Sequence, residues 1–551
     1  MKIKLVSSLE KCFLDENIDE KEEYASGSCL KEELFRFGIC YVAKEACATA
    51  RPVLLTVRSE IARQIAIREV QHVPVKLPVY KTAKNVDYLR TAPGLYPDLL
   101  TPINARNRLL ASNNLESLLV EVDTRKIDKA GVFPIEFVFS DFQSKAVIAS
   151  VVFHLEIIGC VLPKQSLIYT QWFYCDCLMD YYGTKAFDRR HWKIIENYVT
   201  TAAKNGINMI LTPVFTPPLD TFVGGERTTT QLVDVSLCDG VYRFNFDKLG
   251  KWIDICRRAG IEYFEISHFF TQWGAAHAPK IMATVDGKVK KLFGWETEAC
   301  GTEYATFLRA FIPELLAFLR QRKIDGKCVF HISDEPNLSQ LPSYIAAKNV
   351  VAPLLKGYPI VDALSNYEFY ENGTIRHPIP ATNRIEPFLE HQVPDLWTYY
   401  CCSQHDGVSN RFISMPSYRN RIIGVQLYKY AIKGFLHWGY NYYNCQYSYH
   451  AVNPFVSTDG NYFAPAGDAF SVYPARDGTA FESLRLVVFH DALQDMRALE
   501  KCESLYGREY VRKLIEETAG GNLTFKEYPK TQHFLLTLRE KVNQSIKASL
   551  P

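Results

Sequence analysis

Hydrophobic and polar positions alternate along the first third of the chain. Short runs rich in β-branched and aromatic residues are separated by turn residues, at 53–58, 118–123, 131–139 and 146–158. A period of two predicts half-buried strands, and a succession of such strands is typical of a β-sandwich. We therefore predict a β-sandwich domain over residues 1–163. Its acidic residues are dispersed, so we expect it to support or flank a site rather than carry one.

Beyond residue 163 the pattern changes to apolar runs that alternate with stretches of helical spacing. Helices are expected at 188–205, 247–259, 302–323 and 417–433, several with a polar N-cap or a glycine stop. The strands expected between them are 167–177, 207–215, 261–268, 328–333, 358–364, 395–400, 434–438 and 469–474. Eight strands with this alternation favour a (β/α)8 TIM-like barrel over residues 164–500. No glycine-rich phosphate-binding turn follows any of them, which argues against a nucleotide-binding sheet.

Three amphipathic stretches close the chain. The first, at 481–502, is predicted to be the last barrel helix, and those at 508–518 and 531–546 form a C-terminal helical extension over 501–551. The predicted fold is therefore multidomain, with a β-sandwich, an α/β barrel and a short helical tail.

Two adjacent acids, Asp334 and Glu335, follow the apolar run that starts at Cys328. Pro336 disfavours helical backbone at Glu335, so the chain is expected to stay extended through the pair. In a parallel barrel the carboxyl ends of the strands share the face that carries the chemistry. The alternative is that one acid caps the following helix while the other is solvated.

Aromatic and polar side chains gather at the other predicted strand ends. Four of the seven tryptophans lie there, and aromatic rings stack well on sugars although they also fill cores. The candidate substrate-binding residues are His268, Trp273, Tyr367, Trp397, Tyr399, His437, Trp438, Asn441, Asp468 and Tyr473.

Composition narrows the function classes. The net charge of +2 argues against nucleic-acid binding and against a basic membrane surface. No apolar run reaches the length of about 18 residues that a membrane helix needs. The 15 cysteines are an odd number and often lie in apolar runs, which favours free thiols and a cytoplasmic location, as does a start without a signal-peptide pattern.

Metal chemistry is a weaker interpretation. Cys175 and Cys177 form one pair and Cys401 and Cys402 another, but neither has the partner spacing of a zinc site. We therefore predict neither a metal nor another cofactor.

Adjacent acids restrict the mechanism of a glycosidase. A retaining enzyme with a protein nucleophile places its two carboxyls about 5 Å apart across the scissile bond. Consecutive residues do not easily flank a sugar in that way. They suit a substrate whose own 2-acetamido oxygen attacks C1, with one acid protonating the leaving oxygen and the other orienting the acetamide.

Several short motifs resemble glycoside hydrolase family 123, a family of bacterial β-N-acetylgalactosaminidases, and the wider group that shares its catalytic region. They are Phe330 to Pro336, Gly434 to Tyr443, Pro465 to Asp468 with Tyr473 and Pro474, and Ser483 to Asp495. The last block departs from the usual pattern at Val487, His490 and Met496. The similarity spans roughly 169–499, and the β-rich N-terminal region also fits the family's layout.

The resemblance implies a retaining, substrate-assisted exo-hydrolase. Glu335 would be the general acid/base and Asp334 the residue that polarises the acetamide, while Tyr367, Trp397 and Trp438 would contact the sugar. The expected partner is a glycan that ends in N-acetylgalactosamine, and we also consider a homodimer. Two alternatives stay open: a glycosidase for another β-hexosaminide or a neutral sugar, and a non-catalytic carbohydrate-binding protein.

Overall fold

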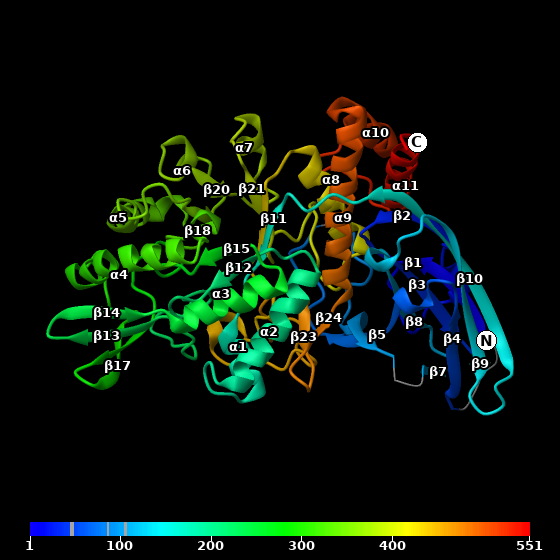
Figure 1. Ribbon diagram of the computed structural model, residues 1–551, viewed down its shortest axis with the longest axis horizontal. Helices are drawn as coiled ribbons and strands as arrows, with labels where there is room; N and C mark the ends of the chain where they lie inside the picture. Colours follow the sequence, from blue (N-terminus) through cyan, green and yellow to red (C-terminus); the bar gives the residue numbers. More distant parts are fainter. Residues whose placement is uncertain (44–48, 85–86, 104–106, 551) are drawn as a thin grey trace. The chain divides into compact units, whose positions relative to one another are not determined.

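The computed structural model describes residues 1–43, 49–84, 87–103 and 107–550 (Figure 1). It divides into two compact units, neither of which is continuous in sequence. The first comprises 1–166, 405–430 and 481–551, and the second comprises 167–404 and 431–480. The predicted domain limits of 1–163, 164–500 and 501–551 stay a prediction.

The first unit contains two five-stranded sheets. In pairing order, one consists of β1 (Lys2–Ser7), β3 (Leu34–Val42), β8 (Glu116–Asp123), β5 (Ile65–Val75) and β6 (Gly94–Pro102). The other consists of β2 (Ser26–Lys31), β10 (Val147–Val161), β9 (Gly131–Asp141), β4 (Arg51–Arg58) and β7 (Arg108–Ala111). Phe37 and Phe153 stack across one shared core with ring centroids 3.9 Å apart. The predicted β-rich N-terminal region is confirmed.

Four helices complete the first unit: α8 (Ser417–Lys429), α9 (Leu484–Tyr506), α10 (Arg508–Ala519) and α11 (Gln532–Ala548). α9 is tied to β6 by a bidentate pair in which Arg485 donates to both oxygens of Asp98, at 2.8 and 2.9 Å. α11 is tied to β2, because the amide of Asn543 donates to the carbonyl of Ser28 at 3.0 Å. None of the helices in the described part of the chain is long and apolar enough to cross a membrane.

The second unit is organised around a six-stranded, wholly parallel sheet that forms a half-barrel. In pairing order its strands are β18 (Cys328–Phe330), β15 (Tyr263–Ile266), β12 (Met209–Thr212), β11 (Ile168–Gln171), β22 (Gly434–His437) and β21 (Trp397–Tyr399). A second parallel pair consists of β19 (Val361–Ala363) and β20 (His377–Ile379). Single parallel bridges join Phe330 to Ile360 and Ala381 to Tyr399.

Helices follow these strands along the chain. They are α1 (Cys175–Tyr182), α2 (Arg189–Lys204), α3 (Asp247–Ala259), α4 (Thr302–Gln321), α5 (Leu341–Val351), α6 (Glu368–Glu371) and α7 (Glu386–Glu390). α2 starts as predicted, with the Asp188 carboxylate accepting from the His191 amide, and α3 ends as predicted at Gly260 in a left-handed conformation. A separate sheet pairs β14 (Val241–Asn245), β13 (Asp234–Cys238), β16 (Ile281–Val285) and β17 (Lys288–Phe293).

The strand expected at 469–474 was wrongly assigned to the parallel sheet: the run contains β23 (Val472–Pro474), which pairs with β24 (Ala480–Glu482). Among the strands that the sequence did not predict is β20, which is only three residues long and contains Pro378, so it gives no periodic signal.

Candidate active site

Asp334 and Glu335 open into one pocket at the carboxyl ends of the parallel strands. They belong to the loop after β18, and their backbone is held on both sides. The carbonyl of Asp334 accepts from the Trp273 amide at 3.0 Å, and the Glu335 amide donates to the carbonyl of Ala363 at the end of β19, also at 3.0 Å. The pair therefore faces a common cavity, as a two-acid mechanism requires.

The backbone at Glu335 corrects the sequence prediction. Its φ is +43°, which is left-handed rather than extended. A left-handed residue before proline is disfavoured, so the two backbone hydrogen bonds hold a conformation that the local sequence would not choose. This turn directs consecutive side chains toward the same pocket, whereas an extended chain would send them to opposite faces.

The pocket has a volume of about 170 Å³ and a largely aromatic wall. Its described lining consists of the two acids with Trp172, Tyr174, Leu219, Asp220, Gln272, Trp273, Ala363, Tyr399, Cys401, Cys402, Ser403, Leu436, Trp438, Gln446, Tyr447 and Phe463. Of the predicted binding residues, Trp273, Tyr399 and Trp438 lie here. Tyr447 of this lining contacts Tyr449, which is exposed and stacks on Phe222 with centroids 4.5 Å apart.

Two neighbouring side chains affect the pKa of Glu335. The Tyr399 hydroxyl donates to Glu335 Oε1 at 2.6 Å. Burial raises the pKa of Glu335, the Tyr399 hydrogen bond opposes this shift, and the charge of Asp468 adds to it. Burial likewise raises the pKa of Asp334 well above its usual range, the charge of Glu335 adds to this, and His331 opposes it. Two neighbouring acids with raised pKa values retain a proton more readily than isolated carboxyls, which is what acid catalysis needs.

Three predicted residues support the wall from behind. Asp468 is buried and accepts from the Trp438 indole at 2.8 Å, so it fixes the ring that lines the pocket. His437 is buried beside Asp468, with its Nε2 at 3.4 Å from the carboxylate. The Asn441 side chain accepts from the Tyr174 amide at 2.9 Å and donates to the Tyr174 carbonyl at 3.0 Å.

Three other predicted residues do not line this pocket. Tyr367 precedes α6 and stacks on His391, with ring centroids 4.6 Å apart. Trp397 lies on β21 against Gly434, where a Cβ on the glycine would come within 2.0 Å of the indole. Tyr473 is buried against Phe455 and Phe470. Each lies near a predicted strand end, but the direction of a side chain there depends on loop geometry that periodicity does not report.

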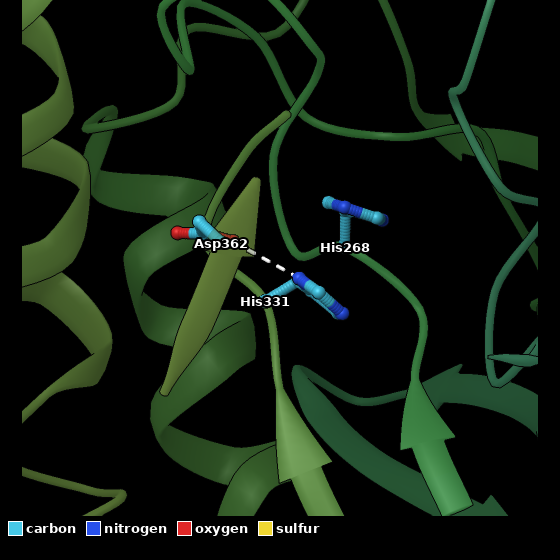
Figure 2. A group of neighbouring side chains, drawn as sticks. All are labelled: His268, His331 and Asp362. Carbon is cyan, nitrogen blue, oxygen red and sulfur yellow. Dashed lines mark hydrogen bonds and ion pairs between the residues drawn. The ribbon is translucent and has the colours of Figure 1, made fainter. Parts of the chain in front are cut away.

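Below the acids lies a buried polar cluster that the sequence analysis missed apart from His268. His331 faces carboxylates with both ring nitrogens. Asp362 Oδ1 lies 3.1 Å from Nδ1 (Figure 2), and Glu265 Oε1 lies 2.7 Å from Nε2. His268 stacks on His331 with centroids 4.3 Å apart. The signal that was available is position, because His331 and Asp362 both lie at or just after parallel strands.

The same cluster contains a candidate metal triad. His268, His331 and Asp362 offer ligand atoms within 4.8 Å of one another. A metal would need a lone pair on a His331 nitrogen. Both of those nitrogens already face carboxylate oxygens, so this donor set fits a hydrogen-bonded ring better than a coordinated ion.

A pair of acids in an aromatic pocket at the ends of parallel strands is the arrangement of a glycoside hydrolase. A family model, the catalytic domain of glycoside hydrolase 123, matches residues 172–502, which is more than half of the chain. The protein therefore belongs to glycoside hydrolase family 123 and is a glycosidase.

One solved structure shares the fold over nearly the whole chain. A family 123 glycoside hydrolase from Clostridium perfringens, described in connection with glycolipid glycan hydrolysis, matches with a TM-score of 0.72 at 13% identity, over 99% of this chain and 97% of that one. At this identity the similarity shows a shared fold. A β-glucuronidase 2 of Bacteroides uniformis matches weakly, with a TM-score of 0.28 at 11% identity, over 86% of this chain and 49% of that one. No curated protein matches the chain.

Proposed function

We propose that the protein is a retaining exo-glycosidase that releases terminal β-linked N-acetylgalactosamine by a substrate-assisted mechanism. The observation that carries this proposal is that two consecutive acids open into one pocket from the same side. Consecutive residues do not easily act across a bond as nucleophile and acid at the usual separation of about 5 Å. It can act on a sugar that brings its own nucleophile.

The proposed reaction has two steps. In the first, the acetamide oxygen of the substrate forms a bond to C1 while the bond from C1 to the leaving oxygen breaks, and Glu335 gives its proton to that oxygen. Asp334 accepts a hydrogen bond from the acetamide N–H and stabilises the positive charge of the oxazolinium ring. In the second step water attacks C1, gives its proton to Glu335 and reopens the ring, so the β configuration is retained.

The size of the pocket supports release of one sugar at a time. A compact cavity of about 170 Å³ that is lined by several aromatic rings suits one terminal sugar better than a long stretch of glycan. The indoles of Trp172 and Trp438 and the rings of Tyr174 and Phe463 provide apolar faces for it. The rest of the glycan would extend past the exposed ring of Tyr449.

We further propose that the eight parallel strands close into a (β/α)8 ring. The β19–β20 pair has a single bridge to each end of the six-stranded sheet, at Ile360 and Ala381. Closure in sequence order would place all eight carboxyl ends, and the acids among them, around one opening.

A chromogenic screen tests the function. We expect hydrolysis of the β-N-acetylgalactosaminide, and slower or no hydrolysis of the β-N-acetylglucosaminide, β-galactoside and β-glucoside. Glu335→Gln and Asp334→Asn should each lower kcat by about two orders of magnitude or more, the scale of lost acid catalysis or charge stabilisation. Wild-type turnover by either variant would contradict the assignment.

The alternatives predict other outcomes of the same screen. Activity confined to substrates without an acetamido group would indicate a glycosidase for neutral sugars, and binding without turnover would indicate a carbohydrate-binding protein. A thiazoline of N-acetylgalactosamine mimics the cyclic intermediate, so we expect it to inhibit competitively. Indifference to the thiazoline would argue against participation of the acetamide.

A further inference from the structure

His331 is surrounded by hydrogen-bond acceptors. It is fully buried in the loop between β18 and the two acids. Its Nδ1 faces Asp362 on β19 (Figure 2), and its Nε2 faces Glu265 on β15. A neutral imidazole has one donor and one acceptor nitrogen, whereas an imidazolium has two donors. The protonation of His331 therefore depends on whether either carboxyl carries a proton of its own.

The contacts of Glu265 are those of an ionised carboxylate. Besides His331 it accepts from the Trp172 indole N–H at 2.7 Å and from the Thr170 hydroxyl at 2.7 Å. An indole nitrogen only donates, so its partner oxygen is an acceptor. Both oxygens of Glu265 thus meet donors, as those of an ionised carboxylate do.

Asp362 is placed in the same way. The Ile332 amide donates to its two oxygens at 3.1 and 3.3 Å, and the Tyr344 hydroxyl donates to Oδ2 at 2.5 Å. Because both carboxylates accept from other donors, they act as acceptors toward His331 too, which then donates from both ring nitrogens. Burial disfavours the charged ring, but hydrogen bonds and charges of Asp362 and Glu265 outweigh it and raise the pKa of His331 to about 10.

His191 shows the contrasting arrangement in the same unit. It is also buried, but its Nδ1 accepts from the Phe187 amide at 2.9 Å while its Nε2 donates to the Cys175 carbonyl at 3.0 Å. One donor and one acceptor partner define a neutral ring, and burial lowers the pKa of His191. The chain therefore contains a matched pair of buried histidines with opposite requirements for charge.

We propose that His331 is a positioning residue of the hydrolase: held as an imidazolium between Glu265 and Asp362, it places a buried positive charge three residues before Asp334 and so opposes protonation of that acid. This inference rests on the proposed function for its consequences in catalysis. The assignment of a positive charge to His331 rests on its hydrogen bonds and does not depend on the proposed function.

The surroundings of Asp334 explain why a buried cation matters. Acidic groups act on Asp334 from its neighbour Glu335, from Asp362 on β19 and from Asp220 in the loop after β12, and each disfavours its negative charge. His331 favours it. Burial raises the pKa of Glu335 as well, where Tyr399 opposes the rise and Asp468 adds to it. Burial still leaves the pKa of Asp334 well above its usual value, so His331 limits this rise and favours the ionised form that can accept the acetamide N–H.

His268 fits this assignment as a neutral neighbour. Both of its ring nitrogens are buried without a hydrogen-bond partner in the described part of the chain, and burial together with the charge of His331 lowers its pKa well below the usual value. Its ring stacks on His331 with planes 22° apart. A neutral aromatic face over an imidazolium is an attractive arrangement.

His331→Gln tests the proposal through the pH profile of kcat/KM on the β-N-acetylgalactosaminide. Loss of the cation raises the pKa of Asp334, so the acidic limb should move to higher pH by about one unit or more, which lowers kcat/KM about tenfold on that limb. At higher pH the kcat/KM of His331→Gln should approach that of the wild type. A uniform loss at every pH, with the limb unmoved, would show a merely structural role and overturn the proposal.

His191→Gln is the matched control. It also replaces a buried histidine by an amide, so it should lower stability, yet the acidic limb should stay where it is. A shift of the limb in this variant equal to that in His331→Gln would mean that the shift reports general loosening, and would overturn the proposal.

Nuclear magnetic resonance of the unsubstituted protein, with 15N-labelled histidine, tests the charge without any substrate. We expect two protonated ring nitrogens on His331 up to at least pH 8. A neutral ring at pH 7 would overturn the proposal even if His331→Gln does not fold. If no sugar is hydrolysed the proposed function fails, but the ring charge, and the carboxyl titration of Asp334 followed by 13C in wild type and His331→Gln, still decide this inference.

Discussion

Two side chains act on Glu335 in opposite directions. Tyr399 donates a hydrogen bond that stabilises the carboxylate, and Asp468 contributes a negative charge that destabilises it. The pH at which the general acid loses its proton is therefore a balance between a hydroxyl at the end of β21 and a carboxylate behind Trp438. Tyr399 and Asp468 can each be substituted while Glu335 itself is kept.

The alkaline limb of the pH profile should report this balance. Tyr399→Phe removes the hydrogen bond, so the pKa of Glu335 rises and the limb should move up by about one pH unit, on the scale of a hydrogen bond to a charged group. Asp468→Asn removes the charge but keeps an acceptor for Trp438, so the limb should move down by a smaller amount. Shifts of both variants in one direction would contradict this account.

The residues that carry chemistry differed in how well the sequence revealed them. Asp334 and Glu335 were visible because two acids follow an apolar run directly. Asp220 and Tyr447 were not, because they lie in long connections between strands that have no period. Tyr174 lies just before α1, inside a run that the sequence predicted as strand, so its place in the pocket was not apparent. Tyr367 was misplaced for the complementary reason: its position after a strand was correct, but its ring turns toward His391.

At the scale of elements, close helix packing depends on single glycines. Gly424 of α8 lies against α9, and a Cβ there would come within 2.0 Å of the Ala492 carbonyl oxygen. Gly250 of α3 is also helical, but a Cβ there would meet only Phe318 at 3.6 Å, an ordinary contact. Both glycines have helical backbone, but only Gly424 lacks room for a side chain.

Alanine substitutions should separate these effects. Gly424→Ala forces two backbones apart and should lower stability by about 1–3 kcal/mol or more, the cost of overpacking. Gly250→Ala should raise it by about 0.5–1 kcal/mol, because alanine favours helix and the space is open. The midpoints of urea denaturation measure the change in stability of each variant. Equal effects of the two substitutions would show that helix propensity, not contact, dominates.

Elements with strong end signals were predictable, and short ones were not. α2 and α3 lie where a capping aspartate and a stop glycine put them. β20 has three residues and a proline, so its place in the parallel pairing comes from its neighbours rather than from its own sequence. The left-handed turn at Glu335 belongs to the same class, because tertiary hydrogen bonds override the preference of a residue before proline.

For the whole molecule, the site is a source of instability as well as of activity. Burial raises the pKa of both Asp334 and Glu335, so each is more easily ionised in the unfolded chain than in the folded protein. Stability from these groups is fully present below the unfolded values near pH 4 and is lost as pH rises through the folded values. Catalytic competence and stability therefore oppose one another near neutrality.

Asp334→Asn should make this opposition measurable. The amide cannot ionise, so the melting temperature should rise at pH 7.5 by roughly 2 °C or more, the shift that about 1 kcal/mol produces in a large domain. The gain should shrink as the pH approaches 4. Calorimetry at both pH values measures it, and a variant that is less stable than wild type at pH 7.5 would contradict the prediction.

The left-handed backbone at position 335 has a practical consequence for capturing substrates. Asparagine tolerates positive φ better than glutamine or a β-branched residue, and it is too short to reach the leaving oxygen. Glu335→Asn is therefore the preferred inactive reagent for isolating natural glycans from a mixture: it relaxes the main chain while leaving the opposite wall of the cavity intact. A library built at this codon would retain folded members mainly among glycine, asparagine and aspartate.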